Sequence, residues 1–270
     1  MPNWVSNSLF LNGSEERVKE LLAFVKTEYS DFDFHAITPM PTDLKNTRCP
    51  MQIISQAEYD EQEKRIAEGK LTDDEKKWGV SRCLTQELYD KYIAEYGACD
   101  WYGFNLQNWG TKWNASEVYI DGNSVHFNTA WSMPYPIYKK LSLMFPDVEI
   151  EVEFMDEDFG HNLGKFSLLN GEEVYAEIPE GGSEEAYIMA FDIGGQSDYY
   201  TWDMFFDIND DSELDKFELS MIKIAYTNDK LVDEEFPKVV LDEFLRLALE
   251  DEEFEFASKI RDIMKSKENA

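Results

Sequence analysis

The amino-acid sequence predicts an α+β protein built on an antiparallel sheet. At 148–155 the run VEIEVEFM alternates apolar and acidic side chains, which is typical of a half-buried strand. Asp121-Gly122 lies between two strand-like runs and is a strong hairpin signal. Apolar residues recur at helical spacing after Ser14. The chain has 270 residues, 43% of them hydrophobic, which is enough for a packed core.

The first elements follow directly from local patterns. NWVSNSLFL, at 3–11, alternates well enough for a strand that stops at Asn12-Gly13. Ser14 can cap the next helix, whose buried stripe is Val18, Leu21, Leu22 and Val25. FDFHAI at 32–37 is expected to be extended. The two prolines of TPMPTDL at 38–44 are expected to prevent helix.

A charged, helix-compatible stretch at 55–97 is expected to form a helical insertion between strands. SEVYIDGNSVHFNTAW then predicts a hairpin, PIYKKLSLMF at 136–145 a short helix, and 148–154 a strand. Without the insertion, the order is strand, helix, strand, strand, helix, strand. That order is the ferredoxin-like split βαβ arrangement, with an antiparallel sheet and two helices on one face, over residues 1–155. The name implies no iron–sulfur cluster, because three scattered cysteines cannot hold one.

The second half is expected to hold an acidic, strand-rich extension at 156–235 and a helical hairpin at 236–268. Asn170-Gly171 predicts another hairpin turn. AYIMAFDI at 186–193 and FELSMIKIAY at 217–226 are further strand candidates. The last segment is helical in two pieces that break near Asp251.

Charge restricts the partners. The net charge is −31, and residues 147–270 hold 35 acidic against 10 basic residues, a net of −25. Such a surface repels phosphate backbones, so direct nucleic-acid binding is not expected. Two interpretations stay open: a solvated acidic surface, or an acidic mimic of nucleic acid that inhibits a host DNA-binding enzyme.

The apolar runs and the cysteines of the sequence predict the cellular compartment of the protein. No apolar run approaches the roughly twenty residues of a membrane-spanning helix, and the start lacks the pattern of a signal peptide. Cys49, Cys83 and Cys99 include no CxxC pair, which favours reduced thiols. A cytoplasmic protein without membrane contact is expected.

Several segments in order carry a family resemblance: MPNW-SN at the start, TPMP, WYGFNLQNWGTKWNA, TAWSMP and FP-VEIEVEF. Over roughly residues 1–155 the chain resembles the YubB-like ferredoxin-fold family, small proteins found on plasmids, phages and bacterial genomes. The resemblance implies the ferredoxin-like fold and a mobile-element setting. It implies no activity, because a fold does not supply a function.

A second resemblance lies in LRLALEDEEFEFASKIRDIMK at 245–265, which is similar to the UVR motif of UvrB and UvrC repair proteins. The matching positions are Ala248, Glu253, Phe254, Glu255, Ala257, Arg261, Asp262 and Ile263. That motif implies an antiparallel helical hairpin for protein–protein contact. Apolar stripes agree: Val240, Phe244, Leu247 and Ala248 on one helix, Phe256, Ala257, Ile260 and Met264 on the other. The expected partner-binding residues are Phe254, Ala257, Ile260 and Arg261, and docking on its own domain is the alternative.

WYGFNLQNWGTKWNA, at 101–115, holds three of the seven tryptophans. The candidate set is Trp101, Asn105, Asn108, Trp109 and Trp113. It could stack on a sugar or base while the amides hydrogen-bond a polar ligand. It could equally fill the core, with buried indole N–H groups donating to asparagine oxygens and Gly110 serving a turn. The core interpretation is favoured.

DINDDSELDKFE, at 207–218, has the spacing of an EF-hand calcium loop. The candidate ligands are Asp207, Asn209, Asp211, Glu213 and Glu218. Ser212 stands where the sharp turn needs glycine, and the strand-like FELSMIKIAY follows. A solvated acidic loop is therefore favoured, and a calcium-binding module is the alternative.

Catalytic motifs are missing from the sequence. His35, His126 and His161 are isolated, and there is no HExxH, GxSxG or dinucleotide-binding glycine pattern. No catalytic residues and no cofactor are expected. The favoured function is a non-enzymatic protein–protein interaction module, and a hydrolase without a recognisable motif is a further alternative.

Overall fold

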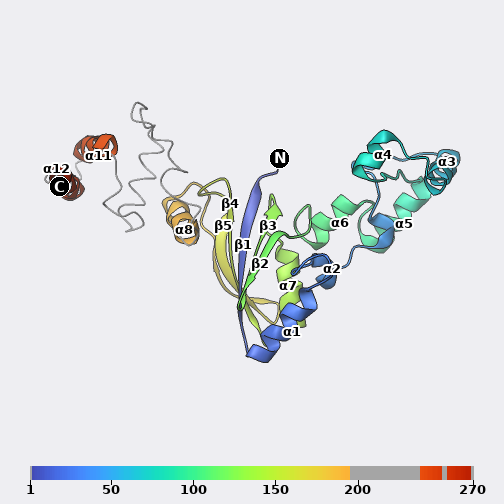
Figure 1. Cartoon of the computed structure of the whole chain (residues 1–270), viewed down its shortest axis with the longest axis horizontal. Coiled ribbons are helices and arrows are strands. Elements are labelled where there is room, and N and C mark those ends of the chain that lie inside the picture. Colours follow the sequence, from blue (N-terminus) through green and yellow to red (C-terminus); the bar gives the residue numbers. More distant parts are fainter. Residues whose placement is uncertain (1, 195–237, 251–253, 269–270) are drawn as a thin grey trace. The chain divides into compact units, whose positions relative to one another are not determined.

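The structure is a computed structural model that describes residues 2–194, 238–250 and 254–268 (Figure 1). It divides into two compact units. One comprises residues 1–157 and 165–177, and the other comprises 158–164 and 178–270. Within the described residues, no helix is both long and apolar enough to cross a membrane.

A six-stranded sheet organises the first unit, in the order β2-β3-β1-β4-β5-β6. Its strands are β1 Trp4–Asn12, β2 Ser116–Asp121, β3 Ser124–Ala130, β4 Glu149–Asp156, β5 Leu163–Leu169 and β6 Glu172–Glu177. β1 pairs antiparallel with both β3 and β4, as do β2 with β3 and β5 with β6. The strands predicted at 3–11 and 148–154 and the hairpin turn after Asp121 are confirmed.

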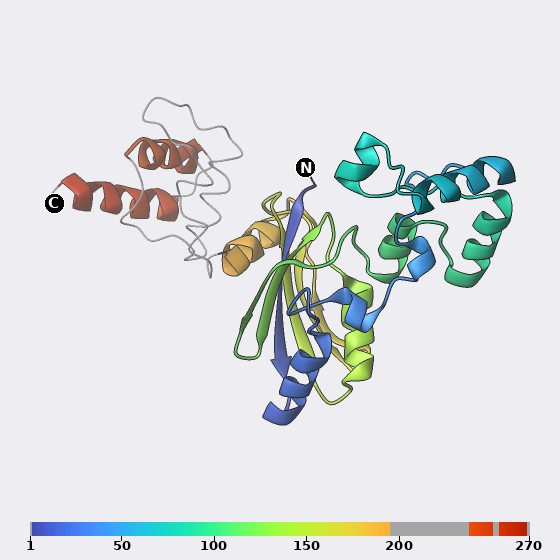
Figure 2. The same cartoon turned by 45° about the vertical axis from the view of Figure 1, so that its right-hand side comes forward.

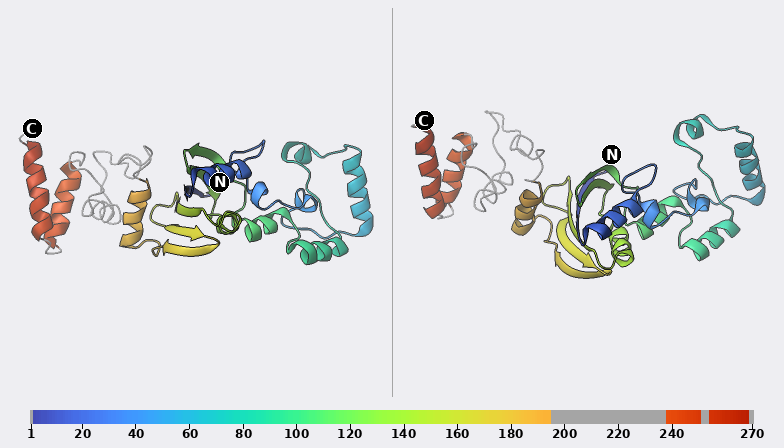
Figure 3. Two further views of the ribbon diagram at one scale, coloured as in Figure 1. Left: turned by 90° about the horizontal axis from the view of Figure 1, so that it is seen from below. Right: turned by 60° about the horizontal axis from the view of Figure 1, so that its bottom comes forward.

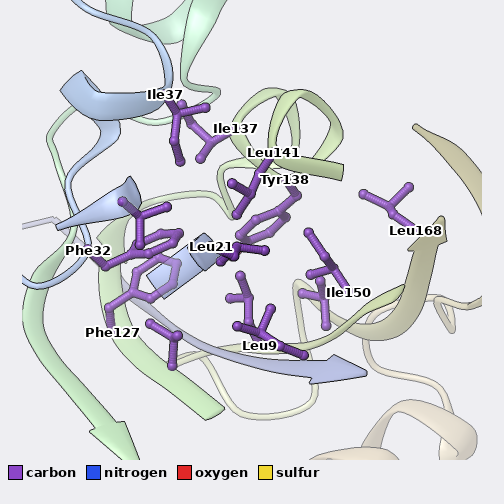
Figure 4. Close-up of a cluster of buried hydrophobic side chains, with 14 of the residues drawn as sticks. Leu9, Leu21, Phe32, Ile37, Phe127, Ile137, Tyr138, Leu141, Ile150 and Leu168 are labelled. Atoms are coloured by element: carbon purple, nitrogen blue, oxygen red, sulfur yellow. The ribbon is translucent and has the colours of Figure 1, made fainter. Parts of the chain in front are cut away.

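Two helices supply the apolar cover of one sheet face. α1 (Glu15–Val25) begins where the Ser14 side chain accepts a hydrogen bond from the Arg17 N–H, as the sequence predicts. α7 (Tyr135–Met144) begins after Pro134. Both helices and the inward side of the strands contribute to one buried cluster. Figure 4 shows Tyr138 and Leu141 of α7 directed toward Leu9 and Ile150 of the strands.

The insertion consists of α3 (Gln56–Ala67), α4 (Asp73–Trp78) and α5 (Gln86–Tyr96), which confirms its helical character (Figure 2). α3 and α4 each begin with a capping box, in which a serine or threonine and a glutamate three residues later cap each other's backbone N–H. Within this segment, α5 packs with α6 (Trp101–Asn108) on a small core separate from the main one. That core consists of Leu44, Leu84, Tyr92, Ala98 and Phe104.

Two predictions of extended structure are wrong. FDFHAI contains the short helix α2 (Phe34–Ile37), because the Asp33 carboxylate accepts a hydrogen bond from the His35 N–H at its start. AYIMAFDI lies in α8 (Glu184–Gly194). The apolar run there gave no clear period, and Ser183 decides the outcome because its Oγ accepts from the Ala186 N–H at 3.1 Å.

The proline-rich segment also differs from expectation, since a 3₁₀ turn forms at Thr42–Leu44. Pro41 precedes that turn, where its missing N–H removes no hydrogen bond. The strand expected at 217–226 lies outside the described residues. α11 (Lys238–Glu250) and α12 (Phe254–Glu268) lie side by side, with the rings of Phe244 and Phe256 6.0 Å apart (Figure 3).

Candidate ligand-binding surface

The tryptophan segment divides between core and surface. Trp109 is buried in the main core, where its ring lies 5.7 Å from that of Phe34. Its indole Nε1 donates to the backbone oxygen of Thr38 at 2.9 Å, rather than to an asparagine side chain as expected. Trp109 therefore joins α2 to the sheet and offers no surface to a ligand.

The amides expected near a ligand act within the segment itself. Asn105 Nδ2 donates to the backbone oxygen of Lys112 at 2.8 Å, and Asn108 Nδ2 donates to that of Phe104 at 3.0 Å. Trp101 opens α6, and its backbone N–H donates to the Thr47 hydroxyl at 3.0 Å. These side chains hold α6 and the following turn in place.

Gly110 makes the turn that leads out of the core. Its φ is +81°, which is in the left-handed region that glycine adopts readily. A Cβ at this position would come within 2.6 Å of Cδ of Pro136 in α7. The turn packs closely on α7, and it brings Lys112 and Trp113 to the surface.

Three side chains then form an indole clamp, defined here as Lys112, Trp113 and Trp131. The two indole rings lie 6.5 Å apart between centroids, with an angle of 23° between their planes. The Lys112 ammonium lies 4.4 Å from the centroid of Trp113 and 4.7 Å from that of Trp131. Trp4 extends the aromatic surface, with its centroid 6.0 Å from that of Trp113.

The backbone of Trp131 is in a conformation that bulky residues avoid. Its φ is +69°, where an L-residue brings Cβ close to the following carbonyl oxygen. The Trp131 N–H donates to the backbone oxygen of Asn3 at 2.9 Å, which ties this residue to the start of β1. Such a conformation persists only where its surroundings enforce it, and such residues cluster at ligand sites.

The clamp lies where three segments of the sheet meet. Trp4 pairs with Ala130 at the start of β1, and its backbone oxygen accepts a hydrogen bond from the Glu157 N–H. Asn3 Nδ2 donates to Asp156 Oδ1 at 3.3 Å at the end of β4. The charged neighbours contributed by β4 and its continuation are therefore carboxylates.

The sheet face away from α1 and α7 carries a further polar group. Ser8 Oγ and His126 Nδ1 lie 2.8 Å apart, and the ring of Tyr119 stacks on His126 at 5.9 Å. Phe10 meets the other side of the imidazole edge-on at 6.2 Å. A nucleophilic serine needs a base that a third polar group orients. Besides Ser8, His126 contacts the aromatic rings of Tyr119 and Phe10.

The α11–α12 pair distributes the expected contact residues between its inside and its outside. Ala257 and Ile260 are fully buried, together with Leu241, Phe244, Ala248 and Phe256. Phe254 is 64% exposed, and Arg261 is exposed on the same side of α12, two turns further along. A partner would therefore meet Phe254 and Arg261 first.

The candidate calcium ligands Asp207, Asn209, Asp211, Glu213 and Glu218 lie outside the described residues. In the part of the chain that the structure describes, no three His, Cys, Asp or Glu side chains are arranged to hold a metal ion. His35 is held by Asp33, whose carboxylate is 3.1 Å from the ring Nδ1.

Comparison with known proteins finds a family model that matches part of the chain. Residues 108–214 match the family model described as the ferredoxin-like domain in Api92-like protein. This segment of the chain resembles that domain. The match includes β2 to β6 and α8 but not β1, so it overlaps the predicted resemblance over 1–155 only from residue 108 onward.

One solved structure is also similar, the protein Api92 from Yersinia pseudotuberculosis. It shares 11% identity with this chain, and the alignment covers 68% of this chain and all of that one, with a TM-score of 0.36. No curated protein matches the chain significantly. The Api92-like match names a ferredoxin-like family without a stated activity.

Proposed function

We propose that the protein is a non-enzymatic protein–protein interaction module whose contact element is the outward face of α12. One observation carries this proposal. α12 buries its apolar stripe, yet Phe254 and Arg261 stay exposed on its other side. Aromatic residues and arginine are enriched where protein interfaces are most tightly held. The resemblance of 245–265 to the UVR motif supports the same role.

The unit that contains the sheet is distinct from the unit that contains α12. We infer that β1, α1, the β2–β3 hairpin, α7 and β4 form the split βαβ core of a YubB-like fold, because their strand order is β2-β3-β1-β4. β5 and β6 extend this sheet at one edge. A rigid sheet of this kind suits a binding module, since it presents side chains without rearrangement.

The test is a nuclease-treated pull-down from host lysate, in which the full chain is compared with Phe254→Asp and with Val174→Asp. Val174 is an exposed apolar residue of β6 and is the matched control. A partner that survives high-salt washing, is lost with Phe254→Asp and is kept with Val174→Asp supports the proposal. Equal retention by both variants contradicts it. Ile260→Asp is unsuitable, because Ile260 is buried and a charge there disrupts the helix pair itself.

The charge distribution supports a second candidate, an acidic nucleic-acid mimic. The net charge of −25 over residues 147–270 would attract the basic groove of a DNA-binding enzyme. In the same pull-down, an acidic mimic is expected to retain a partner that washes off in high salt and that binds wild type and Phe254→Asp equally well.

A further inference from the structure

The indole clamp has the geometry of a cation-binding site. An ammonium within about 6 Å of an indole centroid is attracted by the negative face of the ring. Lys112 Nζ satisfies this distance to two rings at once, at 4.4 and 4.7 Å. The Trp113 and Trp131 rings are close to parallel. Their arrangement therefore already accommodates one alkylammonium group.

The clamp differs from an ordinary surface contact of lysine with tryptophan. The chain contains such a contact at Lys77 and Trp78, where Nζ lies 4.5 Å from one ring that is 76% exposed. At the clamp a second ring joins from the residue after β3, on the other arm of the β2–β3 hairpin. It does so although Trp131 adopts a φ of +69°. Solvent still reaches both clamp rings, since Trp113 is 38% and Trp131 44% exposed.

The surrounding charge decides which ligand suits the clamp. Asp156, at the end of β4, is buried, but Glu157 follows it, is exposed and donates its backbone N–H to the backbone oxygen of Trp4 at the edge of the clamp. A nucleic-acid strand could stack bases on indoles, but it would need lysines and arginines to neutralise its phosphates. The exposed Glu157 and the net charge of −31 oppose a phosphate backbone and attract a basic chain.

We propose that the indole clamp binds a lysine side chain from a basic segment of a partner protein, and that this side chain displaces Lys112. Lys112 occupies the site in the free protein and shows what chemistry fits it. Its neighbours Trp113 and Trp131 supply the cation–π contact, Trp4 extends the apolar wall, and Glu157 together with the net negative charge of the chain attracts the rest of the basic segment. This site is separate from the α12 contact and does not depend on it.

The clamp can be tested with the full chain and a fluorescein-labelled lysine–glycine peptide, by fluorescence anisotropy at physiological salt. Trp113→Leu and Trp131→Gly each remove one ring, and glycine suits the positive φ of residue 131, so the second variant keeps the fold. Each is expected to weaken binding about tenfold. Trp78→Leu removes an exposed indole with a lysine on it and is the control that should change nothing.

A gain of affinity provides the sharper result. Lys112→Gln removes the side chain that occupies the clamp in the free protein. The clamp is then always open to the peptide, so peptide binding is expected to tighten roughly twofold or more. Lys91→Gln removes the same charge from the exposed side of α5 and controls for net charge. Phe254→Asp is expected to leave peptide affinity unchanged, which separates this site from the proposed function.

Four outcomes would overturn the proposal. The peptide does not bind the wild-type chain at millimolar concentration, or the two clamp variants bind it as well as Trp78→Leu does. Lys112→Gln behaves like Lys91→Gln, which would mean that only net charge matters. A labelled single-stranded oligonucleotide binds in place of the peptide and is lost with Trp131→Gly, which would make the clamp a base-stacking site.

Discussion

At Tyr138 the phenol oxygen donates a hydrogen bond to Asn7 Oδ1 at 2.7 Å, and Asn7 Nδ2 in turn donates to Thr129 Oγ1 at 2.9 Å. All three side chains are buried beneath α7. Burial raises the pKa of the Tyr138 phenol well above its usual range, so the group stays a neutral donor. A single hydroxyl thus joins α7 to β1 and, through Asn7, to β3.

Tyr138→Phe is expected to lower the free energy of unfolding by about 1–3 kcal/mol, because Asn7 Oδ1 would remain buried without its donor. Chemical denaturation measured by circular dichroism checks this. Tyr119→Phe removes a hydroxyl from a side chain that is largely exposed and serves as the control. Equal stability of the two variants would show that the buried hydroxyl contributes nothing.

Trp131 provides a second test at this scale. With φ at +69°, Trp131→Gly is expected to be more stable than Trp131→Ala by about 1 kcal/mol, because only glycine adopts this backbone without strain. Thermal melts of the two variants measure the difference directly. Both have lost the indole, so the comparison isolates the backbone. An alanine variant as stable as the glycine variant would mean that Trp131 stores no strain.

Among the elements, alternation and turn chemistry were sufficient to predict β1, the β2–β3 hairpin and β4. They failed at α2 and α8, because both are set by one capping side chain at the start of an apolar run. Trp113 was a predicted candidate, but its partner Trp131 was not. The β2–β3 hairpin brings the two together, since Ser116 pairs with Asn128 and the residues before β2 therefore lie beside those after β3. The hairpin turn was predictable, but the register shift between Ser116 and Tyr119, which sets which residues face each other, leaves no local signal.

Asp33 links α2 to its neighbours through hydrogen bonds whose contribution to stability depends on pH. Its carboxylate accepts from Thr27 Oγ1 at 2.7 Å, from the His35 N–H at 2.9 Å and from Asn114 Nδ2 at 2.8 Å. Burial raises the pKa of Asp33, but these hydrogen bonds together outweigh burial and lower it below its usual value. The carboxylate therefore stabilises the fold.

A lowered pKa means that Asp33 contributes its full stability above its unfolded pKa of about 3.9, and that this contribution is lost as pH falls through the lower folded value. Asp33→Asn is expected to be less stable than wild type at neutral pH. The difference in thermal midpoint between the two proteins should become smaller below about pH 4. Thermal midpoints across this range test it. Asp74→Asn, at an exposed position of α4, controls for loss of charge. A difference in thermal midpoint that stays constant with pH would contradict a lowered pKa for Asp33.

The acidic segment 207–218, which lies outside the described residues, permits a test at the scale of one segment. If Asp207, Asn209, Asp211, Glu213 and Glu218 bind calcium, a ligand that binds only the native state must stabilise it. A calcium module predicts a rise in thermal midpoint with calcium that Glu218→Gln removes. The favoured interpretation, a solvated acidic loop, predicts that wild type and Glu218→Gln respond alike to calcium and to magnesium.

Across the whole molecule, the dominant quantity is the net charge of −31. Like charges repel in the compact state, and salt screens them over a distance of about 8 Å at physiological ionic strength. The same screening weakens the attraction between this surface and a basic partner. Folding and partner binding should therefore respond to salt in opposite directions.

Raising sodium chloride from low to molar concentration is expected to increase the thermal midpoint of the full chain and to weaken binding of the lysine–glycine peptide. The indole clamp limits the second effect, because a short-range contact between an ammonium and two rings is screened less than the attraction between exposed charges. Affinity for wild type should therefore fall less steeply with salt than affinity for Trp131→Gly. Melting curves and anisotropy titrations over one salt series measure both quantities. Parallel salt slopes for the two chains would mean that the acidic surface alone holds the peptide and that the two indoles take no part.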